Sequence, residues 1–285
     1  MKLSSGTVFA LAGGGNLGAA QVGMLYALIE TGIRPDVIVG TSVGALNGAY
    51  LAGHADLEGI QGLAGLWTSK HRRDVFPVSI VDLVRGLLGM RNSLFKSGGL
   101  RRIITKSLLG FSNLEDAPIH LHVVATDLLA SKPIVLSEGP VVEALLASTA
   151  IPGIFPPVER DGHLLVDGGV LANVPIRQAE ALRASRIYVL PTIADGVRSR
   201  PTSALVMMQR AISLTSEPCA RLALEGARSR TRVHVVPVPE RAARLSAFDF
   251  RSTGQLIEDA YEVTSSWIRH YHVRATEPEP RLVAR

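Results

Sequence analysis

Short apolar runs alternate with helix-like stretches along the first fifty residues. Residues 7–12 and 37–39 are apolar runs of the kind that forms buried strands. Between them, apolar residues recur at helical spacing over residues 19–31, and Gly32 follows as a helix stop signal. A second helix-like run occupies residues 45–51. This order predicts parallel βαβ units with helices on both faces of a sheet, so the expected fold class is α/β.

The same two patterns continue through the rest of the chain. Further strands are predicted at residues 120–125, 133–136, 164–166, 186–190 and 233–236, and further helices at 141–148, 178–184, 204–228 and 254–270. Residues 55–118 have a mostly helical but less regular pattern. We expect a core at residues 7–195, then helices and a strand at 196–275 that pack on the same domain, and a disordered tail at 276–285.

The composition favours a folded protein with a large core. Of the 285 residues, 47% are apolar and only 19% are charged, which argues against disorder. The single cysteine, Cys219, excludes an internal disulfide and suits a reducing compartment. The first apolar run is too short for a signal peptide, and no run of about 18 uncharged apolar residues predicts a spanning helix. We therefore expect a protein that is cytoplasmic, or peripheral to a membrane.

Positive charge gathers in one part of the chain. The formal net charge is +5, and residues 70–106 hold nine basic and two acidic side chains. Such a block favours an anionic partner. Because there is no nucleic-acid motif and little aromatic interleaving, we rank an anionic lipid surface above nucleic acid. Residues 78–88 in this block have helical apolar spacing, typical either of a lid or membrane-contact helix or of an ordinary helix packed on the domain.

A serine stands between glycines where the second predicted strand meets a helix. The sequence there is Gly40-Thr41-Ser42-Val43-Gly44. Glycines on both sides allow a sharp turn and a close approach of neighbouring backbone, so the Ser42 hydroxyl can be exposed as a nucleophile. The pattern is weak alone, but its strand-turn-helix setting is the context that a nucleophile elbow requires.

A glycine loop follows the first predicted strand, with the sequence Gly13-Gly14-Gly15-Asn16-Leu17-Gly18. Free backbone N–H groups in such a loop converge on an anion, which in an acyl hydrolase is the tetrahedral oxyanion. The loop also fits a dinucleotide fingerprint, which needs an acid at the carboxyl end of the second strand. Here Asp36 precedes that strand, so the dinucleotide interpretation ranks lower.

An aspartate follows another apolar strand, in Asp167-Gly168-Gly169. An isolated Asp-Gly is usually a turn, but Asp167 and Ser42 both stand at the carboxyl ends of strands, where sites gather in parallel sheets. The later histidines, His234, His270 and His272, have no motif around them. We therefore prefer Asp167 acting directly as the base on Ser42. A carboxylate with a pKa near 4 is a weak base, so this pair needs a desolvated, oriented site.

Two further polar residues have simpler interpretations. Asn47, on the helix after the serine, is interpreted as an internal hydrogen-bond partner rather than a catalyst. Asp127, after the strand at residues 120–125, is interpreted as a turn residue, with a role in shaping the site as the alternative.

Taken together, these motifs resemble the patatin-like phospholipase family. The resemblance spans residues 7–195 and rests on the glycine loop, the serine elbow and Asp167-Gly168-Gly169 in the right order. The blocks at residues 123–128, 147–158 and 173–175 are also similar to the family. The resemblance implies a three-layer α/β/α sandwich around a mainly parallel sheet, with no metal and no cofactor.

In chemical terms, the resemblance implies a Ser–Asp dyad that hydrolyses acyl esters. Ser42 would attack the ester carbonyl, Asp167 would take and return the proton, and the N–H groups of Gly13, Gly14 and Gly15 would hold the oxyanion. Phospholipid or lysophospholipid is the expected substrate, and the oligomeric state is left open. The family's loop usually carries Arg or Lys where this chain has Leu17. That departure keeps a catalytically weak lipid-binding protein as an alternative, beside an esterase, thioesterase or transacylase.

Overall fold

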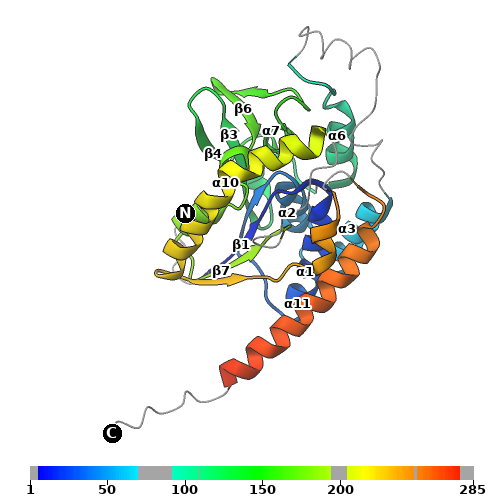
Figure 1. Cartoon of the computed structure of the whole chain (residues 1–285), viewed down its shortest axis with the longest axis vertical. Coiled ribbons are helices and arrows are strands. Elements are labelled where there is room, and N and C mark those ends of the chain that lie inside the picture. The colour runs from blue at the N-terminus through cyan, green and yellow to red at the C-terminus, as the bar shows by residue number, and fades with distance from the viewer. Residues whose placement is uncertain (1–5, 70–91, 109, 194–203, 247–248, 277–285) are drawn as a thin grey trace.

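The computed structural model describes residues 6–69, 92–108, 110–193, 204–246 and 249–276 (Figure 1). Its strands form one sheet in the order β5-β6-β3-β2-β1-β7-β8, with β4 on β3. Their bounds are β1 Thr7–Leu11, β2 Val37–Thr41, β3 His120–Asp127, β4 Lys132–Leu136, β5 Val158–Arg160, β6 His163–Asp167, β7 Arg186–Leu190 and β8 Arg232–Val235. Strands β1, β2, β3, β7 and β8 pair in parallel, so the predicted mainly parallel sheet is confirmed.

Helices cover both faces of this sheet. On one face lie α1 (Ala19–Glu30), α2 (Val43–Gly53), α3 (Leu57–Ser69), α6 (Gly98–Ile103), α7 (Val141–Ser148) and α11 (Thr253–Thr276). On the other lie α8 (Gly169–Ala172), α9 (Ile176–Ala181) and α10 (Ala204–Arg228). Short 3-10 segments occupy Gly15–Gly18, Leu114–Asp116 and Glu240–Arg244, and a π-helical turn occupies Ile104–Leu108.

The alternation of side chains along the strands separates the two apolar layers. In β1, Phe9 and Leu11 join the cluster that contains α1, α2 and α11, whereas Val8 and Ala10 join the cluster with α9 and α10. All four are fully buried. Because successive side chains of a strand point to opposite faces, a strand that is apolar throughout must be covered on both sides. The three-layer α/β/α sandwich is therefore confirmed.

Two strands that run toward each other share one edge of β3. These strands are β2 and β6. Strand β4 pairs with residues 123–127 of β3 and occupies the opposite edge. Strand β2 pairs in parallel with residues 120–124, and β6 continues along the same edge in antiparallel pairing with residues 125–127. The carboxyl ends of β2 and β6 thus meet head-on, with Thr41 opposite Val124 and Asp167 opposite Ala125. This meeting point holds the candidate site.

Described elements after residue 203 pack on the same sheet and its helices. Strand β8 pairs with β7, and α11 lies along α1 (Figure 1). The two helices approach so closely at Gly23 that a Cβ there would lie 2.1 Å from the Ile257 carbonyl oxygen. The division into a core at residues 7–195, a packed segment at 196–275 and a tail at 276–285 remains a prediction.

Several predicted features lie outside the described residues. They are the helical pattern at 78–88, five of the nine basic residues of the block (Lys70, Arg72, Arg73, Arg85 and Arg91) and tail residues 277–285. The described part of the chain contains no helix that is long and apolar enough to span a membrane. Strand β5 and helix α8 were not predicted, and α9 begins two residues earlier than expected.

Candidate active site

Ser42 occupies the sharp turn between β2 and α2. Its backbone has φ 54° and ψ −123°, a conformation that L-residues rarely adopt and that costs about 1–3 kcal/mol. The turn requires glycine on both sides, since a Cβ on Gly40 would lie 2.6 Å from the Ala45 Cα, and one on Gly44 would lie 2.3 Å from the Leu11 carbonyl oxygen. The strand-turn-helix setting inferred for the serine is therefore present.

The Ser42 hydroxyl donates a hydrogen bond to Asp167 Oδ2 at 2.7 Å. The two side chains are 8% and 6% exposed, so the contact is shielded from water. The other carboxylate oxygen, Oδ1, accepts the backbone N–H of Gly169 at 2.7 Å. Asp167 is thereby fixed with one oxygen toward Ser42. The distance is within the range that a general base needs to accept a proton.

Glycines allow the backbone to turn closely after Asp167. A Cβ on Gly168 would lie 2.3 Å from the Val124 carbonyl oxygen, and one on Gly169 would lie 3.0 Å from Asp167 Oδ1. Only residues without a side chain fit at the first of these positions. This explains, in steric terms, why the aspartate is followed by glycine.

Burial changes the basicity of Asp167. Desolvation disfavours the charged form and raises the pKa of this carboxyl to about 6, while the hydrogen bonds from Ser42 and Gly169 limit the rise. The carboxylate is consequently a stronger base than an exposed aspartate, yet it remains largely ionised at neutral pH. An ordinary aspartate is a weak base for serine, and burial of Asp167 supplies the rise in pKa that makes it a stronger one.

The glycine loop lies directly against the serine. A Cβ on Gly13 would lie 3.2 Å from the Ser42 Cβ. The Gly13 N–H donates to the Asn173 carbonyl oxygen at 2.9 Å, and the Gly13 carbonyl oxygen accepts the Thr192 hydroxyl at 2.6 Å. Gly14 and Gly15 donate to no acceptor among the described residues. These two N–H groups are therefore the ones left for an incoming ligand.

A sequence model of the Patatin-like phospholipase family matches residues 9–180, more than half of the chain. The chain belongs to this family.

Several relatives share this region. Patatin-like phospholipase domain-containing protein 7 from Rattus norvegicus is 33% identical over 182 residues, covering 63% of this chain and 13% of that protein. Neuropathy target esterase sws from Drosophila melanogaster is 31% identical over 182 residues, covering 63% and 12%. Lysophospholipase nte1 from Aspergillus terreus is 33% identical over 180 residues, covering 63% and 11%. The chain thus spans only 11% to 13% of the length of these relatives.

Among solved structures, VipD from Legionella pneumophila aligns with 90% of this chain and 67% of its own, at 17% identity and a TM-score of 0.42.

The patatin-like site also depends on Ser148, Asn173 and Thr192, whose individual roles the sequence did not indicate. Ser148 Oγ accepts the backbone N–H of Ser42 at 2.8 Å and donates to the Val124 carbonyl oxygen at 2.6 Å. It therefore ties the strained elbow to β3. Asn173 and Thr192 hold Gly13 in the same way. All three partners are more than 100 residues from the group they hold, so no local spacing could reveal these contacts.

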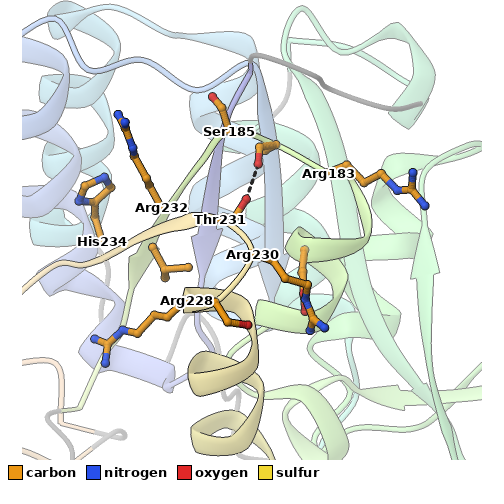
Figure 2. A pocket seen from close by; sticks show the side chains of 11 residues that line it. Arg183, Ser185, Arg228, Arg230, Thr231, Arg232 and His234 are labelled. Atoms are coloured by element: carbon orange, nitrogen blue, oxygen red, sulfur yellow. Dashed lines mark hydrogen bonds and ion pairs between the residues drawn. The ribbon is translucent and has the colours of Figure 1, made fainter.

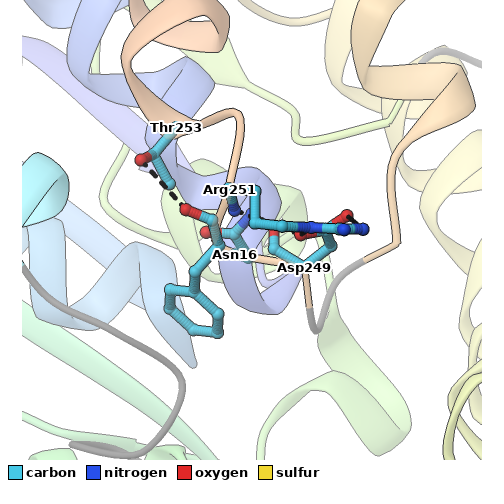
Figure 3. A network of polar contacts seen from close by, with 5 residues as sticks. Asn16, Asp249, Arg251 and Thr253 are labelled. Carbon is cyan, nitrogen blue, oxygen red and sulfur yellow. Dashed lines mark hydrogen bonds and ion pairs between the residues drawn. The ribbon is translucent and has the colours of Figure 1, made fainter.

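Leu17, the departure from the patatin-like pattern, is only 2% exposed and belongs to the apolar core. Its neighbour Asn16 is buried, and its amide nitrogen donates to the Asp249 carbonyl oxygen. Figure 3 shows this contact beside the Asp249–Arg251 ion pair. A segment from the far end of the chain is thereby attached to the glycine loop. No basic side chain occupies position 17, and the loop is held by packing and by the Asn16 amide.

Asp36, His234 and Asp127, the other polar residues considered for the site, have contacts of their own in the structure. Asp36 accepts the backbone N–H of Thr7 at 2.7 Å, at the amino end of β1 and away from the glycine loop. His234 lies on β8, with its ring stacked on Tyr188. Asp127 is the last residue of β3, and its Oδ1 accepts the N–H groups of Leu129 and Ala130 in the turn that follows, while its Oδ2 contacts His163 Nδ1 at 2.7 Å.

Asn47 is confirmed as an internal hydrogen-bond partner. Its amide nitrogen donates to the Gly18 carbonyl oxygen at 2.9 Å and to Gln21 Oε1 at 3.0 Å, and its carbonyl oxygen accepts the Trp67 indole N–H at 2.9 Å. The Asn47 side chain joins the elbow helix α2 to α1 and α3. It is 1% exposed, so water cannot replace these bonds.

We therefore expect Asn47→Ala to lower the free energy of unfolding by roughly 2–4 kcal/mol, because it leaves buried polar groups on Gly18, Gln21 and Trp67 unpaired. Urea unfolding measures this change. Asn113→Ala is the matched control, because Asn113 bonds Asp116 at an exposed position. A loss below about 1 kcal/mol for Asn47→Ala would contradict its bridging role.

Proposed function

We propose that the chain is a serine acyl hydrolase that cleaves fatty-acyl ester bonds of phospholipids or lysophospholipids. The observation that carries this proposal is the buried 2.7 Å hydrogen bond from Ser42 to Asp167. A serine on a strained elbow, a carboxylate with a raised pKa and two free backbone donors beside them are the parts that acyl transfer needs.

The first half of the reaction forms an acyl-enzyme. Asp167 accepts the hydroxyl proton as Ser42 Oγ attacks the ester carbonyl carbon, and the carbonyl oxygen becomes an oxyanion. The free N–H groups of Gly14 and Gly15 are the proposed donors to that oxyanion. Gly13 supports the loop, since its own N–H is bonded to Asn173. The tetrahedral intermediate then collapses, and Asp167 returns the proton to the departing alcohol.

The second half releases the fatty acid. Asp167, ionised again, accepts a proton from a water molecule that attacks the acyl-serine carbonyl. Collapse of this second tetrahedral intermediate breaks the bond to Ser42 Oγ. The proton on Asp167 returns to the serine, and the free fatty acid leaves. Each residue ends in the state in which it began.

The choice of a lipid ester rests on family membership and on relatives named phospholipase, lysophospholipase and esterase. Fatty-acid release from lysophosphatidylcholine and from phosphatidylcholine, measured for wild type and Ser42→Ala, tests it. We expect release by wild type alone. Release only from acyl thioesters would favour the thioesterase or transacylase alternative. A folded protein that binds lipid but releases no fatty acid would favour the lipid-binding alternative.

We also propose peripheral contact with an anionic membrane. We place this contact on the cytoplasmic side, because a chain with a single cysteine suits a reducing compartment. Leu128 and Leu129 are 49% and 74% exposed and directly follow the carboxyl end of β3. Ile193, 39% exposed, follows Thr192, whose hydroxyl bonds Gly13. Exposed apolar side chains thus lie at the end of the sheet that carries the dyad, where lipid must enter.

Basic side chains lie near the same end of the sheet. Arg101, Arg102 and Lys106 are exposed on α6 and the π-helical turn that follows it. The segment that leads into α6 bonds the loop after α7, through the Leu94 N–H and the Gly153 carbonyl oxygen at 2.9 Å. Positive charge beside an apolar edge is typical of surfaces that bind anionic lipid.

We expect Leu128→Ser combined with Leu129→Ser to weaken binding to vesicles of anionic phospholipid about tenfold, because the two apolar side chains that would be buried in the lipid surface are lost. Vesicle sedimentation measures this. Hydrolysis of a soluble short-chain ester should not change. Leu222→Ser is the matched control, since Leu222 is 63% exposed but lies on α10 among residues of α9. Equal vesicle binding by the double variant and wild type would contradict this contact.

A further inference from the structure

A basic concavity lies at the end of the sheet opposite the dyad. It has a volume of about 920 Å³ and is formed by the two loops that lead into β7 and β8, together with the ends of α9 and α10. Figure 2 shows Arg228, Arg232 and His234 on one side of it and Arg183 and Arg230 on the other. We call this feature the basic concavity.

The positive charge of the basic concavity is mostly unneutralised. Four arginines and one carboxylate, Glu180, line it, which gives a formal charge of +3. Glu180 is already paired with Arg230. Within the described part of the chain, Arg183, Arg228 and Arg232 form no ion pair, and all three are exposed. Three guanidinium groups are therefore free to contact one ligand.

Two further features of this region are the left-handed backbone of Arg183 and the lowered pKa of His234. Arg183 has φ 55°, in the left-handed region just after α9, where glycine is the least strained residue. An arginine is nevertheless held there. Burial lowers the pKa of His234, and the positive fields of Arg186 and Arg232 lower it further. The concavity therefore presents positive charge that the chain itself does not balance.

We propose that the basic concavity binds a small soluble anion that carries two or more phosphate groups. Guanidinium groups pair with phosphate oxygens through two parallel hydrogen bonds, a geometry that lysine cannot provide. Because Arg228 and Arg232 lie on the same side of the concavity, a ligand with two linked phosphates pairs with both of them better than a single phosphate does, and the charge of Arg183 across the concavity adds to the attraction.

The position of the concavity indicates that this anion comes from the aqueous phase and not from a membrane. This inference rests on the proposed function. Strand β7 begins at Arg186 beside the concavity and ends at Leu190, two residues before Thr192, which bonds the glycine loop. Five residues of strand extend over roughly 13–16 Å. When the dyad end contacts lipid, the basic concavity faces water, so a headgroup of the same membrane does not reach it.

Calorimetric titration with pyrophosphate, compared with inorganic phosphate at the same low ionic strength, tests the proposal without any turnover. We expect pyrophosphate to bind at least about tenfold more tightly than phosphate, and Arg228→Ala with Arg232→Ala to weaken it by at least about tenfold. Arg244→Ala with Arg269→Ala, exposed arginines elsewhere, should leave binding unchanged. Equal affinity for the two anions, or equal binding by the concavity variant, would overturn the proposal.

Two additional measurements separate the remaining explanations. Arg183→Gly relieves the left-handed backbone, so we expect pyrophosphate binding to weaken severalfold while the melting temperature stays the same or rises. This variant keeps the test decisive if the double variant unfolds. In the second, binding of the Arg228→Ala, Arg232→Ala protein to phosphatidylglycerol vesicles should match wild type. Loss of vesicle binding would assign these arginines to a lipid surface and overturn a soluble ligand.

Discussion

Replacing Ser42 by alanine is expected to lower acyl-ester hydrolysis by roughly 10⁴–10⁶-fold, because the nucleophile of the proposed acyl-enzyme is lost. Only the Oγ atom is removed from a buried contact, so the fold should persist. Initial rates of fatty-acid release from lysophosphatidylcholine measure the effect. Circular dichroism and thermal melting verify that the variant is folded.

Ser42→Gly provides a matched control for the strained backbone at φ 54°. Glycine adopts this conformation without a steric penalty, so this variant should be as inactive as Ser42→Ala but more stable, by about 1 kcal/mol. A Ser42→Ala protein that retains more than about a hundredth of wild-type activity would contradict the assignment of Ser42 as nucleophile.

Asp167→Asn is expected to lower kcat by roughly 10⁴-fold, because an amide cannot accept the serine proton. The wild-type pH profile should report the same group. The pKa of Asp167 is raised to about 6 by burial, so kcat/KM should rise as pH increases toward 6 and level off above it. Rates across pH 4.5–9 on a soluble ester check this limb, which Asp167→Asn should lack.

The Asp167→Asn substitution, which lowers activity, should raise the free energy of unfolding at neutral pH. Because the folded pKa of Asp167 lies above its ordinary value of 3.8, the fold favours the protonated form. The native state therefore loses stability as pH rises from about 4 to about 6, by as much as about 3 kcal/mol. Asp167→Asn removes this penalty and should be more stable than wild type above pH 6, but not below pH 4.

Asp161→Asn is the control for both effects, because Asp161 is an exposed turn residue on the β5–β6 connection with an 82% exposed side chain. It should alter neither the pH profile nor the stability difference. An Asp167→Asn protein with near wild-type kcat, or a wild-type profile that is flat through pH 6, would contradict the role of Asp167 as base.

The local parts of the site could be predicted from the sequence because each depends on neighbouring residues. Gly40 and Gly44 reveal the elbow around Ser42, since only glycine fits so close to Ala45 and Leu11. The apolar pattern of residues 7–11 predicts a strand covered on both faces, and both faces are covered. The helix at residues 204–228 was predicted with the bounds that the structure has.

The assembly of these parts could not be predicted, because it depends on strand pairing between distant segments. The sequence suggested that Ser42 and Asp167 meet at the carboxyl ends of parallel strands. In the structure β6 is antiparallel, and the two residues meet because β2 and β6 run toward each other along β3. The links from Ser148 to Ser42 and from Asn16 to the Asp249 backbone are likewise long-range. Ser148 and Asn16 lie in blocks that carry the family resemblance, but neither block reveals which distant backbone group the side chain binds.

Labelling with a fluorophosphonate probe measures directly whether Ser42 is an activated nucleophile. The probe would be applied to wild type, Ser42→Ala and Asp167→Asn, and the modified peptide mapped by mass spectrometry. We expect a single adduct on Ser42 in wild type that is absent from Ser42→Ala and strongly reduced in Asp167→Asn. A well-folded wild type that takes up no label at Ser42, or an Asp167→Asn protein that is labelled at the wild-type rate, would contradict a Ser42 nucleophile activated by Asp167.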